Sequence, residues 1–463
     1  MKAVLLIDFG STYTKVTAVD LERESVLGTS SAFTTVETDV NDGLQQAVSQ
    51  LKATTGPLDL TARYACSSAA GGLRMIAIGL VPELTAKAAR LAALGAGAKV
   101  IKTYSFQLTE GDLVEIDDAQ PDIVLLTGGI DGGNRDNILY NAEMLSRTKG
   151  NFPIVVAGNR SCADECGRLL QHKRCTLCEN VMPHLGQPNI EPVQAQIREI
   201  FLHQIVRAKG LSATKELIDG ILMPTPSAMM AAMKLLARGT PAERGIGDLI
   251  GLDLGGATTD IYSMTDGLPT GATTILKGLR EPYAKRTVEG DIGMRYSIRG
   301  IVEAGGIDRI CALSEIGEER ALTLINRLAT HPEVVPGRDE ELERLDFALA
   351  SLAVETAVAR HAGTLEPIYT PTGPAAMQQG KDLTAVERII VTGGALIHTR
   401  RTAEIAAHAL FSESEPLSLR PQRARVLIDR SYILAAMGLL GVNAPDAALR
   451  MMKKELTEDG HYK

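Results

Sequence analysis

Aromatic residues are scarce in this chain: they make up 4% of its 463 residues, and tryptophan is absent. The core must therefore be built from Ala, Leu, Ile, Val and Met side chains. Long hydrophobic runs are missing as well. The longest, at about 432–442, falls far short of the roughly 18 residues that cross a bilayer. We therefore expect no membrane partner.

A surplus of positive charge is also lacking. The net charge is −8, and the 48 basic residues are spread among 56 acidic ones. A nucleic-acid surface needs clustered Lys and Arg, so a nucleic-acid partner is excluded. The apolar start at 1–7 is interrupted by Asp8 before it could act as a secretion signal. Six cysteines are too few for a secreted disulfide scaffold. We expect a soluble, cytoplasmic protein.

What is present is a globular pattern. Apolar residues make up 45% of the chain, charged residues 22%, and 44 glycines mark many tight turns. Strand-like and helix-like segments alternate, which indicates an α/β fold. We predict a first lobe at 1–240, with an inserted α/β subdomain at about 71–210, and a second lobe at 241–463. The segment 364–382 is predicted to be an exposed loop and the tail 451–463 to be frayed.

Two short segments share one pattern of residues. Residues 5–15 read LLIDFGSTYTK and residues 250–261 read IGLDLGGATTDI, with Asp8 and Asp253 placed 245 residues apart (253 − 8). In each, an apolar strand ends at the aspartate and a glycine turn with hydroxyl residues follows. Glycines let backbone N–H groups approach a polyphosphate, and hydroxyls add hydrogen bonds. The predicted phosphate ligands are Gly10, Ser11, Thr12, Tyr13 and Lys15 in the first loop, and Gly255, Gly256, Ala257 and Thr258 in the second.

The aspartates suit a metal ion. A carboxylate at the end of each strand can hold Mg²⁺, mostly through the waters of the ion. We therefore predict Asp8 and Asp253 as the metal ligands and ATP with Mg²⁺ as the cofactor. One such turn alone is more often a hairpin, but two after apolar strands favour a site that holds the phosphates from both sides.

A third segment supplies a candidate adenosine loop. Residues 387–399 read ERIIVTGGALIHT, a strand followed by Gly393, Gly394 and Ala395 and then a helix. A glycine pair there lets a base and ribose lie against the backbone. Two helices with small residues on one face, at 225–232 and 435–438, can cross closely and suit a hinge between lobes. Each could also be simply an Ala-rich helix.

In this order, the two phosphate loops, the adenosine loop and the two small-residue helices resemble the acetate and sugar kinase/heat-shock-protein-70/actin superfamily. The resemblance covers nearly the whole chain. It implies two ribonuclease-H-like lobes that close around ATP. Four strings resemble one branch, the glutamate mutase L-component (MutL) family: CSSAAGGLRM (66–75), TGGIDGGN (127–134), ENVMPHLG (179–186) and VEGDIGMR (288–295).

That family is associated with adenosylcobalamin-dependent mutases. The resemblance implies an ATP-dependent chaperone or reactivating factor for a glutamate mutase or aminomutase, whose subunits would be the partners. Heat-shock-type ATPases carry a catalytic Glu before the proline of the first small-residue helix, where this chain has Thr225 before Pro226. We therefore expect slow hydrolysis, with Asp8, Asp253 or Asp260 positioning the water through Mg²⁺.

Three matters stay open from the sequence. A small-molecule kinase on the same fold is one alternative. An ATP-dependent redox activator is another, because Cys162, Cys166, Cys175 and Cys178 include ligand spacings, although i and i+3 on a strand point to opposite faces. The segment 131–134 is either a turn that opens a helix or a second ligand site. The number of subunits is not determined, and a homodimer is among the options.

Overall fold

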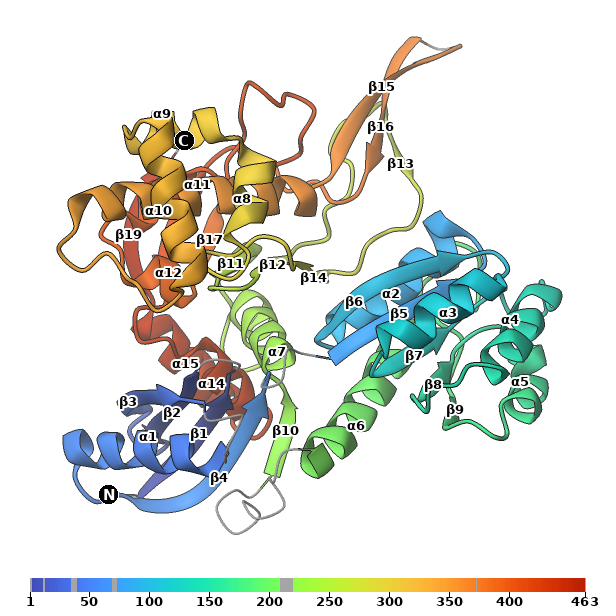
Figure 1. The fold of residues 1–463 in the computed structure, drawn as a ribbon, viewed down its shortest axis with the longest axis horizontal. Helices are drawn as coiled ribbons and strands as arrows, with labels where there is room; N and C mark the ends of the chain where they lie inside the picture. The colour runs from blue at the N-terminus through green and yellow to red at the C-terminus, as the bar shows by residue number, and fades with distance from the viewer. Residues whose placement is uncertain are drawn as a thin grey trace. The chain divides into compact units, whose positions relative to one another are not determined.

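The structure is a computed structural model that describes residues 2–10, 13–34, 40–68, 73–208, 220–371 and 373–462 (Figure 1). The chain divides into two compact units. Unit one comprises Met1–Ala232, Gly278–Arg280 and Ala435–Met451. Unit two comprises Met233–Lys277, Glu281–Leu434 and Met452–Lys463. No helix in the described ranges is both long and apolar enough to cross a membrane.

The first sheet of unit one has five strands in the order β10-β4-β1-β2-β3. Their bounds are β1 Lys2–Phe9, β2 Tyr13–Asp20, β3 Ser25–Phe33, β4 Asp59–Ser67 and β10 Gly220–Pro224. The β1, β2 and β3 strands form an antiparallel meander, whereas β4 and β10 continue from β1 in parallel. In chain order this arrangement is 3-2-1-4-5, the strand order of ribonuclease-H-like folds. Helix α1 (Val40–Thr55) packs on this sheet with Leu44 and Leu51 buried (Figure 1).

The residues between β4 and β10 form a subdomain with its own five-stranded sheet. Its order is β6-β5-β7-β8-β9, and every pair is parallel. The strands are β5 Leu73–Gly79, β6 Ala98–Ser105, β7 Ile123–Leu126, β8 Ile154–Val156 and β9 Cys175–Leu177. The helices are η1 Pro82–Ala86, α2 Lys87–Gly95, α3 Glu110–Ala119, α4 Asp136–Ser146, η2 Arg160–Cys162, α5 Ala163–Leu169 and α6 Glu191–Ala208.

Both faces of this parallel sheet are buried, as expected when helices cover a sheet on both sides. Ile76 and Ile78 of β5 pack in one apolar cluster, and the alternate residues Met75 and Ala77 pack in the other. This alternation follows from the two-residue repeat of a strand.

The main sheet of unit two has six strands in the order β14-β12-β11-β17-β18-β19. They are β11 Leu249–Leu254, β12 Thr259–Met264, β14 Ala284–Glu289, β17 Arg388–Thr392, β18 Ala424–Ile428 and β19 Thr457–Tyr462. The first five repeat the 3-2-1-4-5 order, again with an antiparallel meander and parallel fourth and fifth strands. The prediction of two ribonuclease-H-like lobes, the first with an inserted α/β subdomain, is thus confirmed.

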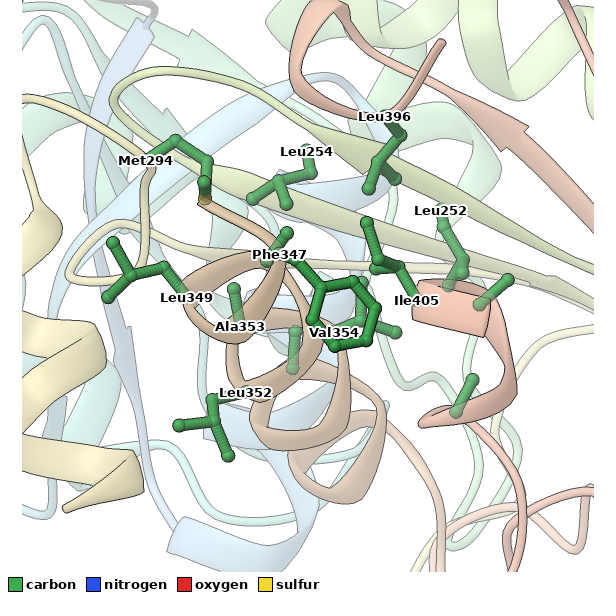
Figure 2. Close-up of a cluster of buried hydrophobic side chains, with 14 of the residues drawn as sticks. Leu252, Leu254, Met294, Phe347, Leu349, Leu352, Ala353, Val354, Leu396 and Ile405 are labelled. Atoms are coloured by element: carbon green, nitrogen blue, oxygen red, sulfur yellow. The ribbon is translucent and has the colours of Figure 1, made fainter. Parts of the chain in front are cut away.

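The core of unit two forms between this sheet and the 22-residue helix α11 (Glu340–His361). Figure 2 shows Phe347 and Val354 of that helix near Leu252 of β11, with Leu396 close by. Sheet residues and helix residues therefore share one apolar cluster. The other helices that lie wholly within the unit are α8 Ile298–Gly305, α9 Ile307–Ser314, α10 Glu318–Thr330, α12 Gly394–Ile397 and α13 Thr402–Ala407.

Two predictions about irregular segments are wrong. The segment 364–382 forms a hairpin of β15 (Thr364–Thr370) and β16 (Gly373–Gln379), which joins β13 (Thr274–Lys277) in a three-stranded sheet (Figure 1). The tail forms β19, which pairs antiparallel with β18. The side chains of β15 and those of residues 457–460 are exposed or half-buried, so these segments lack the apolar alternation that marks a half-buried strand.

Candidate functional site

The first candidate phosphate loop is a tight turn between β1 and β2. The N–H of Gly10 donates to the carbonyl of Tyr13 at 3.1 Å. A Cβ on Gly10 would lie 2.5 Å from that same oxygen, so only glycine fits. The ring of Tyr13 lies 4.5 Å from that of Phe33, both substantially exposed. Ser11 and Thr12 lie outside the described residues.

The second candidate phosphate loop repeats the first. The N–H of Gly255 donates to the carbonyl of Thr258 at 2.9 Å, the same connection 245 residues later (255 − 10). The N–H groups of Arg295 and Tyr296 donate to the carbonyl of Gly256 at 2.8 and 2.9 Å. The loop is thus supported by the segment after β14, and the VEGDIGMR string at 288–295 covers the end of β14 and most of that segment. Sequence reasoning noted this string only as a family signature.

Close packing explains a glycine in that supporting segment. A Cβ on Gly293 would lie 2.4 Å from the carbonyl carbon of Ala257, inside the loop. Arg295, the last residue of the string, forms an ion pair with Asp346, with 2.7 Å between a guanidinium nitrogen and Oδ2. Both side chains are largely buried. Burial raises the pKa of Asp346, although the hydrogen bonds from Arg295 oppose that shift. Gly293, Arg295 and Asp346 were not predicted as site residues.

Asp8 lies at the end of β1 and is 7% exposed. The hydroxyl of Thr225 donates to its Oδ1 at 2.5 Å, and the thiol of Cys66 approaches the same oxygen at 3.5 Å. Burial raises the pKa of the Cys66 thiol, and the negative charge of Asp8 raises it further, so this cysteine stays protonated. Parallel pairing explains the meeting, because β1, β4 and β10 end at the same edge of the sheet.

Of these two partners of Asp8, Thr225 was noted in the sequence only as a departure from the heat-shock-type pattern. Cys66 was noted only as the first letter of a family string. The signal that could have identified both is their place at the ends of predicted parallel neighbours of the Asp8 strand.

Asp253 lies beside the candidate adenosine loop. It pairs in register with Thr392 at the end of β17. Gly393 follows with φ +92°, and a Cβ there would lie 2.7 Å from Oδ1 of Asp253 and 2.5 Å from the carbonyl oxygen of Leu254. In the part of the chain that the structure describes, a Cβ on Gly394 would meet no atom within 4 Å apart from its neighbours along the chain and its own helix backbone. Unit two therefore brings the second phosphate loop and the predicted Gly393–Gly394–Ala395 loop together.

Lys15 and Asp260 occupy corresponding places in the two units. Lys15 is paired across the sheet with Asp8, and Asp260 is paired with Asp253. Asp260 is held by Arg286, whose Nε donates to its Oδ1 at 2.7 Å, with both side chains largely buried. The structure therefore gives Asp260 a partner within its own sheet. Its role in positioning water stays a prediction.

The two small-residue helices meet in unit one. A Cβ on Gly438 of α14 (Leu434–Leu440) would lie 1.9 Å from the carbonyl oxygen of Ala228 in α7 (Thr225–Arg238). The approach therefore requires glycine at this crossing. The start of α14 is capped by Asp429, which is 1% exposed and accepts from the N–H of Ile433 at 2.9 Å.

Asp429 also connects the start of α14 to the adenosine loop. Its Oδ2 accepts a hydrogen bond from the hydroxyl of Thr392 at 3.2 Å, at the end of β17. Sequence reasoning missed Asp429, which follows β18 directly. The helix α15 (Pro445–Glu455) completes this part of the chain.

The four cysteines do not form one cluster. Cys162, Cys166 and Cys175 pack on one face of the subdomain sheet, whereas Cys178 packs in the cluster on the other face. Burial raises the pKa of Cys166 to about 12. Among the described residues, no group of three or more His, Cys, Asp or Glu side chains is placed to hold a metal ion. The two-faced arrangement is the one expected for positions i and i+3 of a strand.

Comparison with known proteins decides the family. A family model described as MutL protein matches residues 4–456. The chain belongs to the MutL family. It is also 46% identical over 462 residues to the protein MutL of Clostridium tetanomorphum, with 99% of this chain and 100% of that protein covered. The predicted resemblance to the MutL branch is confirmed.

Solved structures give weaker likenesses. The ligand-bound xylulose kinase of Lactobacillus acidophilus matches 100% of this chain and 94% of its own, with a TM-score of 0.38 and 11% identity. The activator of the 2-hydroxyisocaproyl-CoA dehydratase from Clostridium difficile, with bound ADPNP, covers 99% of both chains with a TM-score of 0.32 and 9% identity. The fold assignment of this MutL-family chain therefore rests on its two 3-2-1-4-5 sheets.

Proposed function

We propose that this chain binds ATP with Mg²⁺ and acts as a slowly hydrolysing reactivating factor for an adenosylcobalamin-dependent mutase of the glutamate mutase or aminomutase type. The observation that supports ATP binding is the repeated turn. Gly10 and Gly255 make the same hydrogen bond to the third residue on, and each follows an aspartate at the end of a buried strand. Two such turns in duplicated sheets are suited to phosphate.

The kinds of residue at the two loops support the proposed nucleotide and metal ion. Asp8 and Asp253 would hold Mg²⁺, whose charge would offset that of the phosphates. The open space at Gly394 leaves the backbone accessible to an adenosine. Lys15 stands opposite Asp8 and adds positive charge beside the first loop. The backbone N–H groups of the two loops would orient the phosphates.

Slow hydrolysis is supported by the place of Thr225. Its hydroxyl is a donor to Asp8, and a threonine cannot take a proton from an attacking water as a carboxylate can. Slow turnover suits a protein that changes state with its nucleotide more than it suits a metabolic kinase. Membership in the MutL family supports the mutase as the partner.

Calorimetry with MgATP tests the proposed binding of ATP. Wild type should bind one ATP per chain, and phosphate release in the same samples should be slow. Asp8→Asn and Asp253→Asn should each abolish the binding, whereas Asp59→Asn, at an exposed position at the start of β4, should leave it unchanged. Absence of binding in wild type would overturn the proposal.

An assay of mutase reactivation tests the proposed role with an adenosylcobalamin-dependent mutase. A glutamate mutase that has lost activity during turnover should regain it when this chain, ATP and fresh adenosylcobalamin are added. The same mixture without ATP, or with the Asp8→Asn chain, should not restore activity. Recovery that is equal with and without the chain would overturn the mutase role while leaving ATP binding intact.

A further inference from the structure

The subdomain between β4 and β10 has a reversal in its strand order. Numbered along the chain, its sheet runs 2-1-3-4-5, because β5 lies between β6 and β7 (Figure 1). The chain leaves β5 toward one edge of the sheet and leaves β7 toward the other. In parallel α/β sheets, ligands bind outside the carboxyl ends of the strands at such a reversal.

The loop that follows β7 at this point is held in one shape by buried amides. It reads TGGIDGGN at 127–134. Asn159, which is 1% exposed, accepts from the N–H of Gly132 at 3.1 Å and donates to the carbonyls of Gly133 and Asn134. A loop whose only task is to open a helix does not need such a network.

A second buried amide supports the same loop. Asn180 follows β9, is 4% exposed, and donates to the carbonyl of Gly129 at 3.1 Å and to Oδ1 of Asp131 at 2.8 Å. The N–H of Arg160 donates to that same carboxylate oxygen. The Asp131 carboxylate therefore already has hydrogen-bond donors, from Asn180 and from the N–H of Arg160.

The glycines at this edge leave buried donors without acceptors. Gly128, Gly129 and Gly158 are all buried, and in the described ranges the N–H of none of them has a hydrogen-bond acceptor. The carbonyl groups of two of these glycines are paired, because that of Gly128 accepts from the N–H of Asn159 and that of Gly129 accepts from the side chain of Asn180. Buried N–H groups are nearly always paired, so donors left over at one edge point to an acceptor ligand.

The approach of the two loops also requires glycine. A Cβ on Gly158 would lie 2.8 Å from the nitrogen of Gly128 and 2.3 Å from Cδ1 of Ile138. A side chain at 158 would thus cover the donor of Gly128. Arg160 begins η2 directly after this loop, is exposed, and has no side-chain partner among the described residues. This edge of the sheet therefore combines the unpaired N–H groups of the three glycines with the positively charged side chain of Arg160.

We propose that the carboxyl edge of β5, β7 and β8 is an anion site, which takes a phosphate monoester or diester through the N–H groups of Gly128, Gly129 and Gly158. Arg160 adds a charge-assisted contact. The site is separate from the loops at Gly10 and Gly255 and does not depend on ATP binding there. A phosphate of this kind occurs in free nucleotides and in the nucleotide tail of a corrinoid.

Hydrogen–deuterium exchange on the full chain tests the site, with inorganic phosphate as the probe and chloride at equal ionic strength as the reference. We expect peptides that cover 127–134 and 157–160 to exchange more slowly with phosphate, in wild type and in Asp8→Asn alike. Arg160→Gln should need roughly tenfold more phosphate for the same protection, as expected for the loss of one charge-assisted contact. Arg168→Gln, also exposed in the same subdomain, should match wild type.

Gly158→Ala gives the second variant, because its methyl group would cover the donor of Gly128. It should lose the protection while peptides from β6 and α3 exchange as in wild type, which shows that the subdomain still folds. No protection in wild type, or equal protection in Gly158→Ala, would overturn the proposal. With ADP, cobalamin and cobinamide (which lacks the phosphodiester tail) as further probes in Asp8→Asn, the ligand that protects at the lowest concentration identifies the source.

Discussion

The hydroxyl of Thr225 donates a hydrogen bond to Oδ1 of Asp8 at 2.5 Å, although the two residues are 217 positions apart. One stands at the start of α7 and the other at the end of β1. The intervening chain holds β2, β3, α1, β4, the whole inserted subdomain and β10. The side chain at the position where heat-shock-type ATPases carry a catalytic Glu thus donates to the carboxylate that we propose as a metal ligand.

Thr225→Val removes that hydrogen bond while keeping the shape of the side chain. Because Asp8 is buried, we expect the free energy of unfolding to fall by about 1–2 kcal/mol in urea titrations. Thr54→Val, at an exposed helix position where the hydroxyl donates to the carbonyls of Gln50 and Leu51 in its own helix, serves as the control. Equal stability of Thr225→Val and wild type would contradict the importance of this contact.

Gly393→Ala tests the meeting of the adenosine loop and the second phosphate loop. The added methyl group would lie 2.7 Å from Asp253 and would require a left-handed backbone at φ +92°. We expect nucleotide binding to be lost and the free energy of unfolding to fall by about 2 kcal/mol or more. Gly394→Ala, where the methyl group meets no atom of the described residues within 4 Å, should unfold like wild type and is the control for stability. Similar behaviour of the two variants would argue against this packing.

Variants of the buried pair of Asp260 and Arg286 test whether Asp260 has a structural or a catalytic role. Arg286→Met leaves the carboxylate buried without its partner and should cost about 3–5 kcal/mol of unfolding free energy. The double variant Asp260→Leu/Arg286→Met should recover most of that stability. Arg423→Met, which breaks an exposed pair with Glu387, should change little. ATP hydrolysis at the wild-type rate in the double variant would remove Asp260 from the predicted catalytic residues.

Lys381 predicts a specific dependence of stability on pH. Burial, together with the nearby charge of Lys285, lowers the pKa of Lys381 to about 7, and its ammonium group donates to the carbonyls of Thr265 and Tyr283. An unfolded lysine titrates near 10.4. Between these values the unfolded chain binds the extra proton, so this group makes stability rise with pH from about 7 to about 10.

Urea titrations between pH 6.5 and 9.5 measure that effect. The slope for wild type should exceed the slope for Lys381→Met, by at most about 1.4 kcal/mol per pH unit. His361 contributes little to this difference, because burial and the neighbouring lysines lower its pKa well below the range measured. Parallel curves for the two proteins would show that Lys381 keeps an ordinary pKa.

Treatment that removes zinc and iron should leave the protein without nucleotide unchanged. Because Cys178 packs on the opposite face from the other three cysteines, we expect no stoichiometric zinc or iron after purification. Chelation should leave the melting temperature within error, and Cys178→Ser should behave as a mild packing variant. A visible absorption band after anaerobic purification would contradict this and favour the redox activator.

The sequence was most informative where one residue type is required by local geometry. The places of Asp8 and Asp253 in buried strands, and of Gly10 and Gly255 in the turns that follow, could be predicted because this pattern recurs in one order. The resemblance that rests partly on this repeat implied the duplicated sheets. These features are local, so a single sequence carries them.

Contacts between distant residues could not be read in the same way. The roles of Thr225, Arg295 and Asp429 depend on which strands become neighbours, and that is decided by packing of the whole sheet. The hairpin at 364–379 was missed because its strands are exposed and lack apolar alternation. Polar strands of this kind look like loops when read one at a time.

The crossing of Ala228 and Gly438 has a consequence for the order in which the protein can be made. Helix α14, near the end of the chain, packs against α7, which is synthesised some two hundred residues earlier. The helices that complete unit one leave the ribosome only after nearly all of unit two. The subdomain between β4 and β10 can finish folding during translation, but its host must wait for the last residues.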